Sequence, residues 1–352
     1  MRQRRNSEPR AGGGKSRRAV ITLKPHVALL LETSTEYGRG LMRGIVRYSR
    51  LHGPWSLYVA PGHLAQALPK AKSWSGTGII ARIRSPEMAN LIRATKLPFV
   101  ASSLDESRPP GRGDKFGEIR TNSAAIARVA AAHLVERKVR HYAFCGFVGL
   151  GWSMRREEAF TRYIQDLGFP CQTHRIDLSN WMQQRNWIET WEDEQPILMQ
   201  WLKSLPKSVG LMACNDICGR EVLQACAAAG LHVPDDVVVL GVDNDEMMCE
   251  LSNPPLSSIA LDLDRSGYEA ARLLDNLMSG QPAGEHVVQV EPHYVVTRQS
   301  SDVVVQDDPC VATAIRFIKN HAGQAIGVPN VVEQAAVSRR TLERRFFHAL
   351  GR

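Results

Sequence analysis

The sequence predicts an α/β protein with two lobes built on parallel sheets, followed by a small all-α segment. Short apolar runs such as 26–31 and 237–242 alternate with amphipathic helical patterns as far as residue 279. Strands that alternate with helices at this spacing form parallel sheets with helices on both faces. Beyond residue 308 the pattern becomes wholly helical. Two successive α/β blocks, at about 26–138 and 139–256, predict the two lobes.

Local sequence patterns predict the strands and helices of each block. Short runs rich in β-branched and aromatic residues predict strands at 26–31, 55–60, 77–81, 97–102, 141–146, 209–214, 236–242 and 256–261. Apolar residues three or four apart, followed by a glycine or another break, predict helices at 38–53, 85–96, 122–138, 153–168, 216–230 and 265–280.

The organisation predicted from these patterns has four parts: a basic tail at 1–25, a two-lobed domain at 26–296, a linker at 297–308 and a helical segment at 309–352. Open parallel sheets bind ligands beyond the carboxyl ends of their strands. The cleft between the lobes is therefore the expected ligand site.

Positive charge is concentrated at the two ends of the chain. The net charge is +8, yet residues 1–18 hold seven Lys/Arg against one Glu and residues 309–352 hold seven Lys/Arg against two Glu. The centre is thus mildly acidic, as a domain for small molecules can be. The basic tail is expected to be solvated or to touch DNA phosphates weakly.

The helical segment predicts a helix-turn-helix. Asp308 and Pro309 suit the start of a first helix, 329–336 predicts a short second one, and Ser338 suits the cap of a third. In the third helix the residues expected to face inward are Leu342, Phe346, Ala349 and Leu350, and those expected to face outward are Arg340, Thr341, Arg344 and His348. A helix of this kind can enter the major groove of DNA.

Arginine is the side chain best suited to guanine edges and to phosphate. The candidate DNA-binding residues are Ser338, Arg339, Arg340, Thr341, Arg344 and Arg345. The alternative is a solvated helix face that is merely rich in arginine.

The run from Ile315 to Arg352, with its Ser-Arg-Arg-Thr-Leu-Glu-Arg-Arg-Phe stretch, resembles the first helix-turn-helix of AraC-type DNA-binding domains. Members of that family carry a second helix-turn-helix, and the sequence ends before one. The resemblance implies promoter or operator DNA as a partner. The alternative is a truncated sugar-binding protein without specific DNA binding.

The larger domain resembles LacI/GalR-type sensor domains, which are similar to periplasmic sugar-binding proteins. The resemblance rests on the long block at 213–246 (ACNDICGREVLQACAAAGLHVPDDVVVLGVDNDE) and on NPPLSSIALDLDRSGYEAARLL at 253–274, with shorter stretches before them. A sensor of this type placed before an AraC-type motif resembles the family of bacterial xylose operon regulators, from about residue 26 to the end. The resemblance implies a sugar effector, xylose or a related sugar, and a homodimer.

The same resemblance places ligand contacts at Arg156, Asn215, Asp216 and Asp243, with Arg39 as a weaker addition. Guanidinium, amide and carboxylate groups suit vicinal hydroxyls. The alternatives are helix capping for Asp216 and Asp243, and surface ion pairs with Glu157, Glu158 or Asp166 for Arg156.

Asn122 and Trp152 have other interpretations than ligand contact. The family commonly has Asp-Asn where this chain has Thr121 and Asn122, and Asn122 is interpreted as a helix cap. Trp152 is either a packing residue or an aromatic face for a sugar ring.

Catalytic, metal and cofactor sites are not predicted. The cysteines lack the paired short spacing of a zinc site, and no nucleophile or carboxylate pair is spaced for catalysis. Gly146, Gly149 and Gly151 follow a strand but in the wrong order for a dinucleotide loop, so an α/β dehydrogenase is the least favoured alternative. No run is long enough to span a membrane, and seven irregularly spaced cysteines suit the reducing cytoplasm. The chain is therefore expected to be a cytoplasmic, sugar-responsive transcription regulator, not an enzyme.

Overall fold

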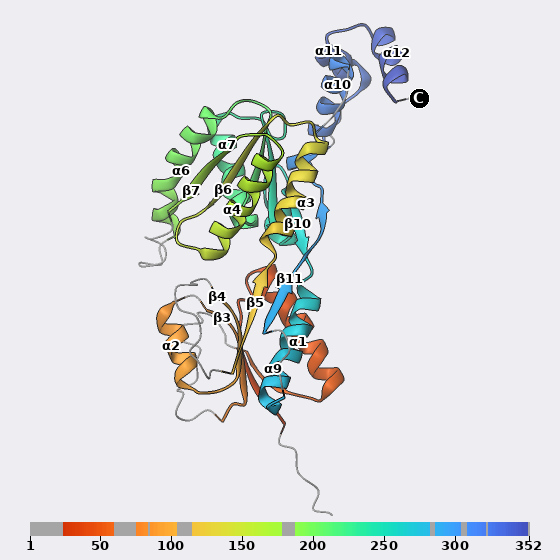
Figure 1. Cartoon of the computed structure of the whole chain (residues 1–352). Helices are drawn as coiled ribbons and strands as arrows, with labels where there is room; N and C mark the ends of the chain where they lie inside the picture. The colour runs from red at the N-terminus through yellow and green to blue at the C-terminus, as the bar shows by residue number, and fades with distance from the viewer. Residues whose placement is uncertain are drawn as a thin grey trace, which may run out of the picture.

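Two six-stranded sheets form the bodies of two lobes, and a helical unit lies beyond the second lobe (Figure 1). This arrangement comes from a computed structural model, which describes residues 24–59, 75–83, 85–103, 115–177, 187–281, 286–303, 308–321 and 323–350. The basic tail expected at 1–25 lies almost wholly outside the described residues. The α/β class with two parallel-rich sheets is confirmed.

Lobe 1 contains a wholly parallel sheet in the order β11-β5-β4-β3-β1-β2. Its sheet is made mostly from the first part of the chain and is completed by a helix and a strand that return from residue 263 onward. The elements are β1 (His26–Leu30), α1 (Glu36–His52), β2 (Ser56–Val59), β3 (Gly78–Ile83), α2 (Pro86–Ala94), β4 (Phe99–Ser103), β5 (Phe116–Thr121), α9 (Leu263–Ser279) and β11 (Val287–Val290).

Lobe 2 contains a sheet in the order β12-β10-β9-β8-β6-β7, in which only the described pairing of β12 with β10 is antiparallel. Its elements are α3 (Ser123–Glu136), β6 (His141–Phe147), α4 (Gly151–Asp166), β7 (Cys171–Ile176), α6 (Trp187–Ser204), β8 (Val209–Ala213), α7 (Asp216–Ala229), β9 (Val237–Asp243), α8 (Glu246–Glu250), β10 (Ser257–Leu261) and β12 (Pro292–Val296).

The division into lobes differs from the two consecutive blocks expected from the sequence. Helix α3 packs on α4, β10 and β12 and therefore belongs to lobe 2, while α9 packs on α1 and on the strands of lobe 1. The repeating strand-helix pattern is the same whichever sheet a strand joins. The alternation of strands and helices in the sequence therefore predicts where the elements lie, but it does not show at which residues the chain passes from one lobe to the other.

The chain crosses between the lobes three times, at 121–123, 261–263 and 290–292. These crossings are hydrogen-bonded to one another: the Asn122 N–H donates to the Val290 carbonyl and the Asp262 N–H to the Glu291 carbonyl, each at 2.9 Å. The Asn122 amide also donates to the Glu291 carboxylate at 2.9 and 3.0 Å. These three short, hydrogen-bonded segments connect the lobes and are here called the hinge bundle.

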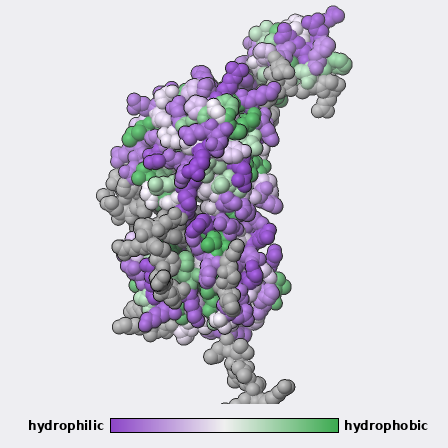
Figure 2. All heavy atoms as spheres, viewed as in Figure 1, coloured by the Kyte–Doolittle hydropathy of each residue, from purple (hydrophilic) through white to green (hydrophobic). Residues whose placement is uncertain are grey.

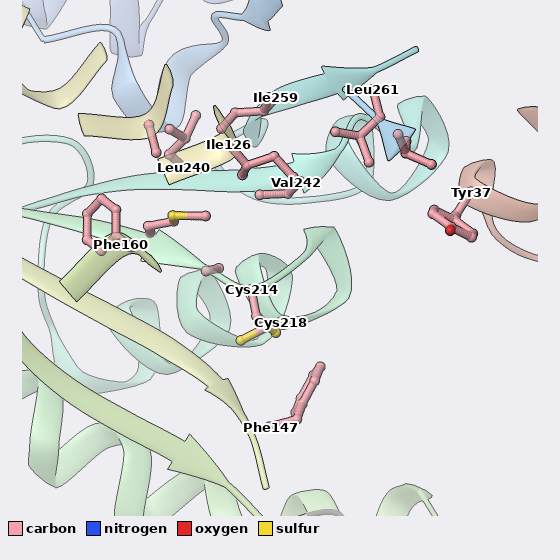
Figure 3. Packing of buried hydrophobic residues seen from close by; sticks show 14 of the residues in the cluster. Tyr37, Ile126, Phe147, Phe160, Cys214, Cys218, Leu240, Val242, Ile259 and Leu261 are labelled. Atoms are coloured by element: carbon pink, nitrogen blue, oxygen red, sulfur yellow. The ribbon is translucent and has the colours of Figure 1, made fainter. Parts of the chain in front are cut away.

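The main hydrophobic core lies between the sheets and their covering helices. In lobe 2, Ile126 of α3 lies beside Leu240, Val242 and Ile259, which project from neighbouring strands (Figure 3). All four side chains are fully buried. Each such burial contributes about 1.5–3 kcal/mol relative to an exposed side chain.

The segment expected as a linker at 297–308 is in part a packed element of lobe 2. A short 3₁₀ turn, Gln299–Ser301, buries Ser300 and Ser301 completely. The Ser300 hydroxyl donates to the Val239 carbonyl at 2.7 Å and accepts from the Ser257 N–H at 2.8 Å. Residues 298–302 therefore move with lobe 2, and residues 304–307 lie outside the described residues.

Three helices follow: α10 (Pro309–Asn320), α11 (Val328–Ala335) and α12 (Arg339–Leu350), here called the C-terminal unit. Helix α10 begins as expected, because the Asp308 carboxylate accepts from the Cys310 N–H at 2.9 Å. In the view of Figure 2, the unit lies beyond the end of lobe 2. Its small core consists of Ala314, Val331, Ala335 and Leu342.

The spacing of Val311, Ile315, Ile318 and Ala322 in the sequence predicts that these four residues share one buried face of α10, and the observed face differs. Val311 is buried and Ala314 enters the core of the unit, but Ile318 is 40% exposed. Ala322, also expected on that face, lies outside the described residues. No helix in the described ranges is both long and apolar enough to cross a membrane.

Candidate functional site

A cavity lies between the two lobes, at the carboxyl ends of strands from both sheets, and encloses about 30 Å³ that a water-sized sphere can occupy. Strand ends in an open parallel sheet leave side chains and backbone groups free to face a ligand. Lobe 1 contributes Tyr37, Arg82, Ser102, Ile119, Arg120 and Thr121, and lobe 2 contributes Trp152, Arg155, Arg156 and Asp243.

Arg156 and Asp243 form the central pair of the lobe 2 wall. The Arg156 Nη2 lies 3.4 Å from the Asp243 Oδ1, and the Nη1 donates to the Cys214 carbonyl at 2.5 Å. The Arg156 guanidinium also lies over the Trp152 ring, 5.2 Å from its centroid. With a side chain only 3% exposed, Arg156 is held in one orientation toward the cavity.

The alternative of a surface ion pair for Arg156 is wrong. Glu157 pairs with Arg175 at 2.8 Å and Glu158 pairs with Arg162 at 2.7 Å. Each position along α4 turns the side-chain direction by about 100°, so Arg156 points inward while its two neighbours point elsewhere.

Asp243 occupies a strained position that the surrounding loop supports. Its φ is +104° and that of Asn244 is +49°, conformations that cost about 1–3 kcal/mol each in residues other than glycine. The Asn244 N–H donates to the Ser258 hydroxyl at 3.0 Å, and the Arg298 guanidinium donates to the Asn244 side-chain oxygen at 3.0 Å. Burial raises the pKa of Asp243, and the positive charges of Arg156 and Arg82 oppose that rise.

Asp216 lies behind Asp243 rather than in the cavity wall. It is 2% exposed, and its carboxylate accepts from the Ser258 hydroxyl at 2.5 Å and from the Asp245 N–H at 2.6 Å. Burial, followed by the nearby charge of Asp243, raises its pKa well above the ordinary value. Asp216 therefore supports the loop that presents Asp243.

The expectation that Asn215 and Asp216 line the cavity is corrected by these positions. Asn215 is the N-cap of α7, where its side chain accepts from the Cys218 N–H at 2.9 Å. The alternative of capping is also wrong for Asp216 and Asp243, because the caps of α7 and α8 are Asn215 and Asp245. The sequence block at 213–246, on which the family resemblance rests, predicts which strand ends reach the cavity. It does not show which of the polar side chains there face it.

Arg39 also lies outside the cavity wall and instead joins the lobes. Its Nη2 lies 3.0 Å from the Asp245 Oδ2, and the same oxygen accepts from the Glu36 N–H at 2.7 Å. Glu36 and Arg39 belong to α1 in lobe 1, whereas Asp245 belongs to lobe 2. We call Glu36, Arg39 and Asp245 the interlobe latch.

The lobe 1 wall contains residues that the sequence analysis missed. The Arg82 guanidinium lies over the Tyr37 ring at 5.0 Å and pairs with Glu32 at 3.1 Å. Arg120 pairs with Glu118 at 2.6 Å. Burial raises the pKa of Tyr37, so its hydroxyl is a hydrogen-bond donor at neutral pH. Each of these arginines is the second-to-last residue of its strand, Arg82 in β3 and Arg120 in β5, and this position near the strand end was the signal available.

Asn122 is the N-cap of α3, as expected: its side chain accepts from the Ala125 N–H at 3.0 Å. Thr121, which precedes it, lines the cavity. Trp152 packs at the edge of the core, as its packing interpretation predicts, and it also lines the cavity. Its contact with a sugar ring stays a prediction.

The candidate DNA-binding residues divide into two groups on α12. Arg340 and Arg344 are exposed, and the Ser338 hydroxyl accepts from the Thr341 N–H at 3.2 Å. Arg339 pairs with Glu343 along the helix at 2.8 Å. Arg345, expected to face DNA, instead points back toward α10.

Arg345 is half-buried, and its Nη1 lies 3.0 Å from the Asp308 carboxylate at the start of α10. Its position one residue after Arg344 turns it about 100° around the helix, toward the neighbouring helix rather than solvent. The sequence pattern did not distinguish the two. Among the described residues, no group of three or more His, Cys, Asp or Glu side chains could hold a metal ion.

Comparison with known proteins agrees with this architecture. Residues 131–301 match the periplasmic binding protein-like domain family, and residues 26–108 match the XylR N-terminal domain family. Among curated proteins, the xylose operon regulatory protein of Haemophilus influenzae is 30% identical over 330 residues, which cover 93% of this chain and 83% of the relative. The protein of the same name from Escherichia coli is 29% identical over 340 residues, 94% of this chain and 83% of the relative.

Solved structures give the same relationship. The structure described as the xylose-binding transcription activator xylR superposes with a TM-score of 0.75 at 27% identity, covering 94% of this chain and 83% of that one. A periplasmic binding protein/LacI transcriptional regulator from Alkaliphilus metalliredigens, in complex with D-xylulofuranose, has a TM-score of 0.60 at 19% identity and shares the fold. It covers 79% of this chain and 99% of that one. By sequence and by fold, this chain belongs to the xylose operon regulatory protein family.

Proposed function

We propose that this chain is a transcription regulator that binds a sugar in the interlobe cavity and changes its hold on promoter DNA in response. The observation that carries the proposal is the pair formed by Arg156 and Asp243 in the cavity wall, 3.4 Å apart and facing Tyr37 and Arg82 of the opposite lobe. A guanidinium and a carboxylate side by side can donate to one sugar hydroxyl and accept from the next. Both curated relatives bear the name of xylose operon regulators.

Sugar binding favours whichever arrangement of the lobes gives it more contacts. A ligand in this cavity touches both lobes at once, so it stabilises the closed arrangement. The hinge bundle allows that movement, since the described chain passes between the lobes at three neighbouring crossings. The interlobe latch already contributes two polar contacts to the closed form.

DNA contact is assigned to the C-terminal unit, in which α11, the turn at 336–338 and α12 have the order of a helix-turn-helix. The turn is sharp because Ala336 has a φ of +55°, and α12 then presents Arg340 and Arg344 to solvent. Such side chains can read guanine edges in the major groove. One small unit contacts few phosphates, so we propose that a homodimer of cytoplasmic chains binds two half-sites.

The test combines ligand titration with a gel-shift assay on the full chain. D-Xylose and other pentoses and hexoses are titrated by calorimetry, and promoter fragments are shifted with and without sugar at two salt concentrations. We expect a saturable heat signal and a sugar-dependent change in DNA affinity. A sugar-binding protein that shifts no fragment at low salt would instead be a sensor without DNA binding, and the regulator proposal would fall.

A further inference from the structure

One aromatic side chain of the C-terminal unit lies in solvent. Phe347 of α12 is 62% exposed, whereas its neighbour Phe346 packs against the small core of the unit. The Phe347 ring lies 6.2 Å from the ring of His348, which is itself exposed. Single apolar side chains are common on protein surfaces, so the position of Phe347 on the helix decides whether the ring has a function.

Phe347 lies on the same face of α12 as Arg340 and Arg344. Successive residues of an α-helix are turned by about 100°, so these three side chains leave the helix within about 60° of one another. All three are exposed. Leu342 is buried and Phe346 packs inward, both on the opposite side of the helix. The outward face of α12 therefore combines two arginines with one aromatic ring.

This combination fits the base edges in the major groove of DNA. Guanine presents two acceptors, O6 and N7, to an arginine, and thymine alone among the four bases presents a methyl group to an apolar side chain. An apolar protein groove would bury the two guanidinium groups without partners. A second copy of the same face would place arginine against arginine, and like charges across an interface are unfavourable. The two arginines on either side of the ring thus favour DNA as the partner that covers it.

Resting on the proposal that α12 contacts promoter DNA, we propose further that Phe347 reads a thymine by packing on its 5-methyl group. Residues 340 and 347 are about 10 Å apart along the helix axis, the length of about three base-pair steps. With α12 along the groove, the thymine lies about three base pairs from the base that Arg340 contacts. Phe347 is then a specificity-determining residue that acts beside the two arginines.

The first experiment selects binding sites from a library of random DNA duplexes with the full chain at low salt. For the parent chain we expect an enriched motif in which a thymine lies within about four base pairs of a guanine. Phe347→Ala should enrich the same motif without a preference at that thymine, because alanine is too short to reach the methyl group.

The second experiment replaces each thymine of the selected duplex, one at a time, by deoxyuridine. The replacement removes the methyl group and keeps the base pair. At one position the affinity of the parent chain should fall about fourfold, the factor that corresponds to burial of one methyl group. The affinity of Phe347→Ala should not change at that position.

The matched control is Ile318→Ala, which removes an apolar side chain that is 40% exposed on α10, outside the helix-turn-helix. This variant should select the motif of the parent chain and show the same fourfold loss with deoxyuridine. Melting temperatures establish that both variants are folded, and light scattering compares their molecular mass with that of the parent chain.

The outcomes separate this inference from the proposed function. If the parent chain tolerates deoxyuridine at every thymine, or if Phe347→Ala shows the same loss as the parent chain, the thymine contact is refuted and DNA contact stands. If Phe347→Ala lowers the molecular mass and keeps the thymine preference, the ring belongs to an interface between copies, and the thymine contact is again refuted. If the folded parent chain enriches no duplex, DNA contact itself is refuted, and the thymine contact with it.

Discussion

Arg156 and Asp243 meet in the wall of the interlobe cavity with 3.4 Å between the Nη2 of the first and the Oδ1 of the second. They come from α4 and from the end of β9, 87 positions apart in the chain. Both side chains are held in place. The Cys214 carbonyl accepts a hydrogen bond from Arg156, and the strained loop at 243–244 fixes the backbone of Asp243. The pair is thus ready to bind before a ligand arrives.

The carboxylate of Asp243 is expected to be essential for ligand binding. Asp243→Asn keeps the size of the side chain but removes the charge, and a hydrogen bond to a charged group contributes about 1.5–3 kcal/mol. We therefore expect calorimetric affinity for the preferred sugar ligand to fall roughly 10- to 150-fold. Asp166→Asn, an exposed position at the end of α4, is the control and should bind as the parent chain does. An unchanged affinity in Asp243→Asn would remove this residue from the site.

The interlobe latch should tune the closed arrangement without touching the ligand. Arg39 is 38% exposed, so its ion pair with Asp245 contributes about 0.2–1 kcal/mol after screening by solvent. Arg39→Ala is expected to weaken ligand affinity by no more than about fivefold and to increase the radius of gyration measured by X-ray scattering without ligand. The effect on affinity should shrink at high salt. A loss as large as that of Asp243→Asn would place Arg39 in direct contact with the ligand.

Arg344 and Arg345 should separate DNA recognition from stability. Arg344→Ala is expected to weaken binding to the specific promoter by about 1–3 kcal/mol, because the proposed DNA contact places this exposed arginine at a base edge. Arg345→Ala should instead lower the stability of the C-terminal unit by about 0.2–1 kcal/mol through loss of the ion pair with Asp308. Gel shifts on specific and random DNA, with thermal melts of both variants, give the measurement. Equal losses on both DNAs for Arg344→Ala would make it a phosphate contact.

His133 should make the stability of the chain depend on pH. Burial and then the charge of Arg137 lower its pKa to about 3, from an ordinary value of 6.5. A lowered pKa favours the neutral form in the folded state, so the stabilisation is complete above pH 6.5 and is lost as the pH falls from 6.5 toward 3. The free energy of unfolding should therefore decrease by about 1.4 kcal/mol per pH unit in that window.

The variant His133→Gln isolates this contribution, because an amide does not titrate. Urea unfolding at pH 7.5, 6 and 5 should give a shallower pH slope for the variant than for the parent chain. His321, which is half-buried in the C-terminal unit, provides a control in His321→Gln. Identical slopes in the parent and in His133→Gln would show that His133 does not titrate in this range.

Much of the fold follows from hydrophobic periodicity. The strands and helices that were predicted between residues 26 and 280 lie close to their observed ranges, since local pattern determines which elements form, but the strand Phe116–Thr121 and the helix Trp187–Ser204 were not predicted. The strand Cys171–Ile176 was missed because its middle, QTHR, is polar and half exposed at the edge of the sheet. Lobe membership was also missed, because it depends on long-range pairing such as that of β11 with β5.

The site was predictable in type but only partly in its residues. Arg156 and Asp243 were expected and lie together, whereas Arg82 and Arg120 reach the cavity from strand ends that carry no motif. Asn215 and Asp216 lie in the same stretch of sequence as the site, but Asn215 caps α7 and Asp216 supports the loop that presents Asp243. Which of several polar neighbours faces a cavity is decided by side-chain direction and backbone strain, as at Asp243, and neither is visible in a sequence.

Helix α3 has a consequence for how a signal leaves the cavity. It starts at Asn122 in the hinge bundle, and near its other end His133 and Arg137 hold the backbone and hydroxyl of Ser301. Arg316 of the C-terminal unit pairs with Asp235 of lobe 2 at 2.9 Å. In the proposed regulation, the C-terminal unit therefore moves with lobe 2 while ligand binding changes the angle between the lobes. In the proposed dimer, joined through its first lobes, that change in angle alters the distance between the two copies of α12, and this distance determines whether both fit an operator with two half-sites.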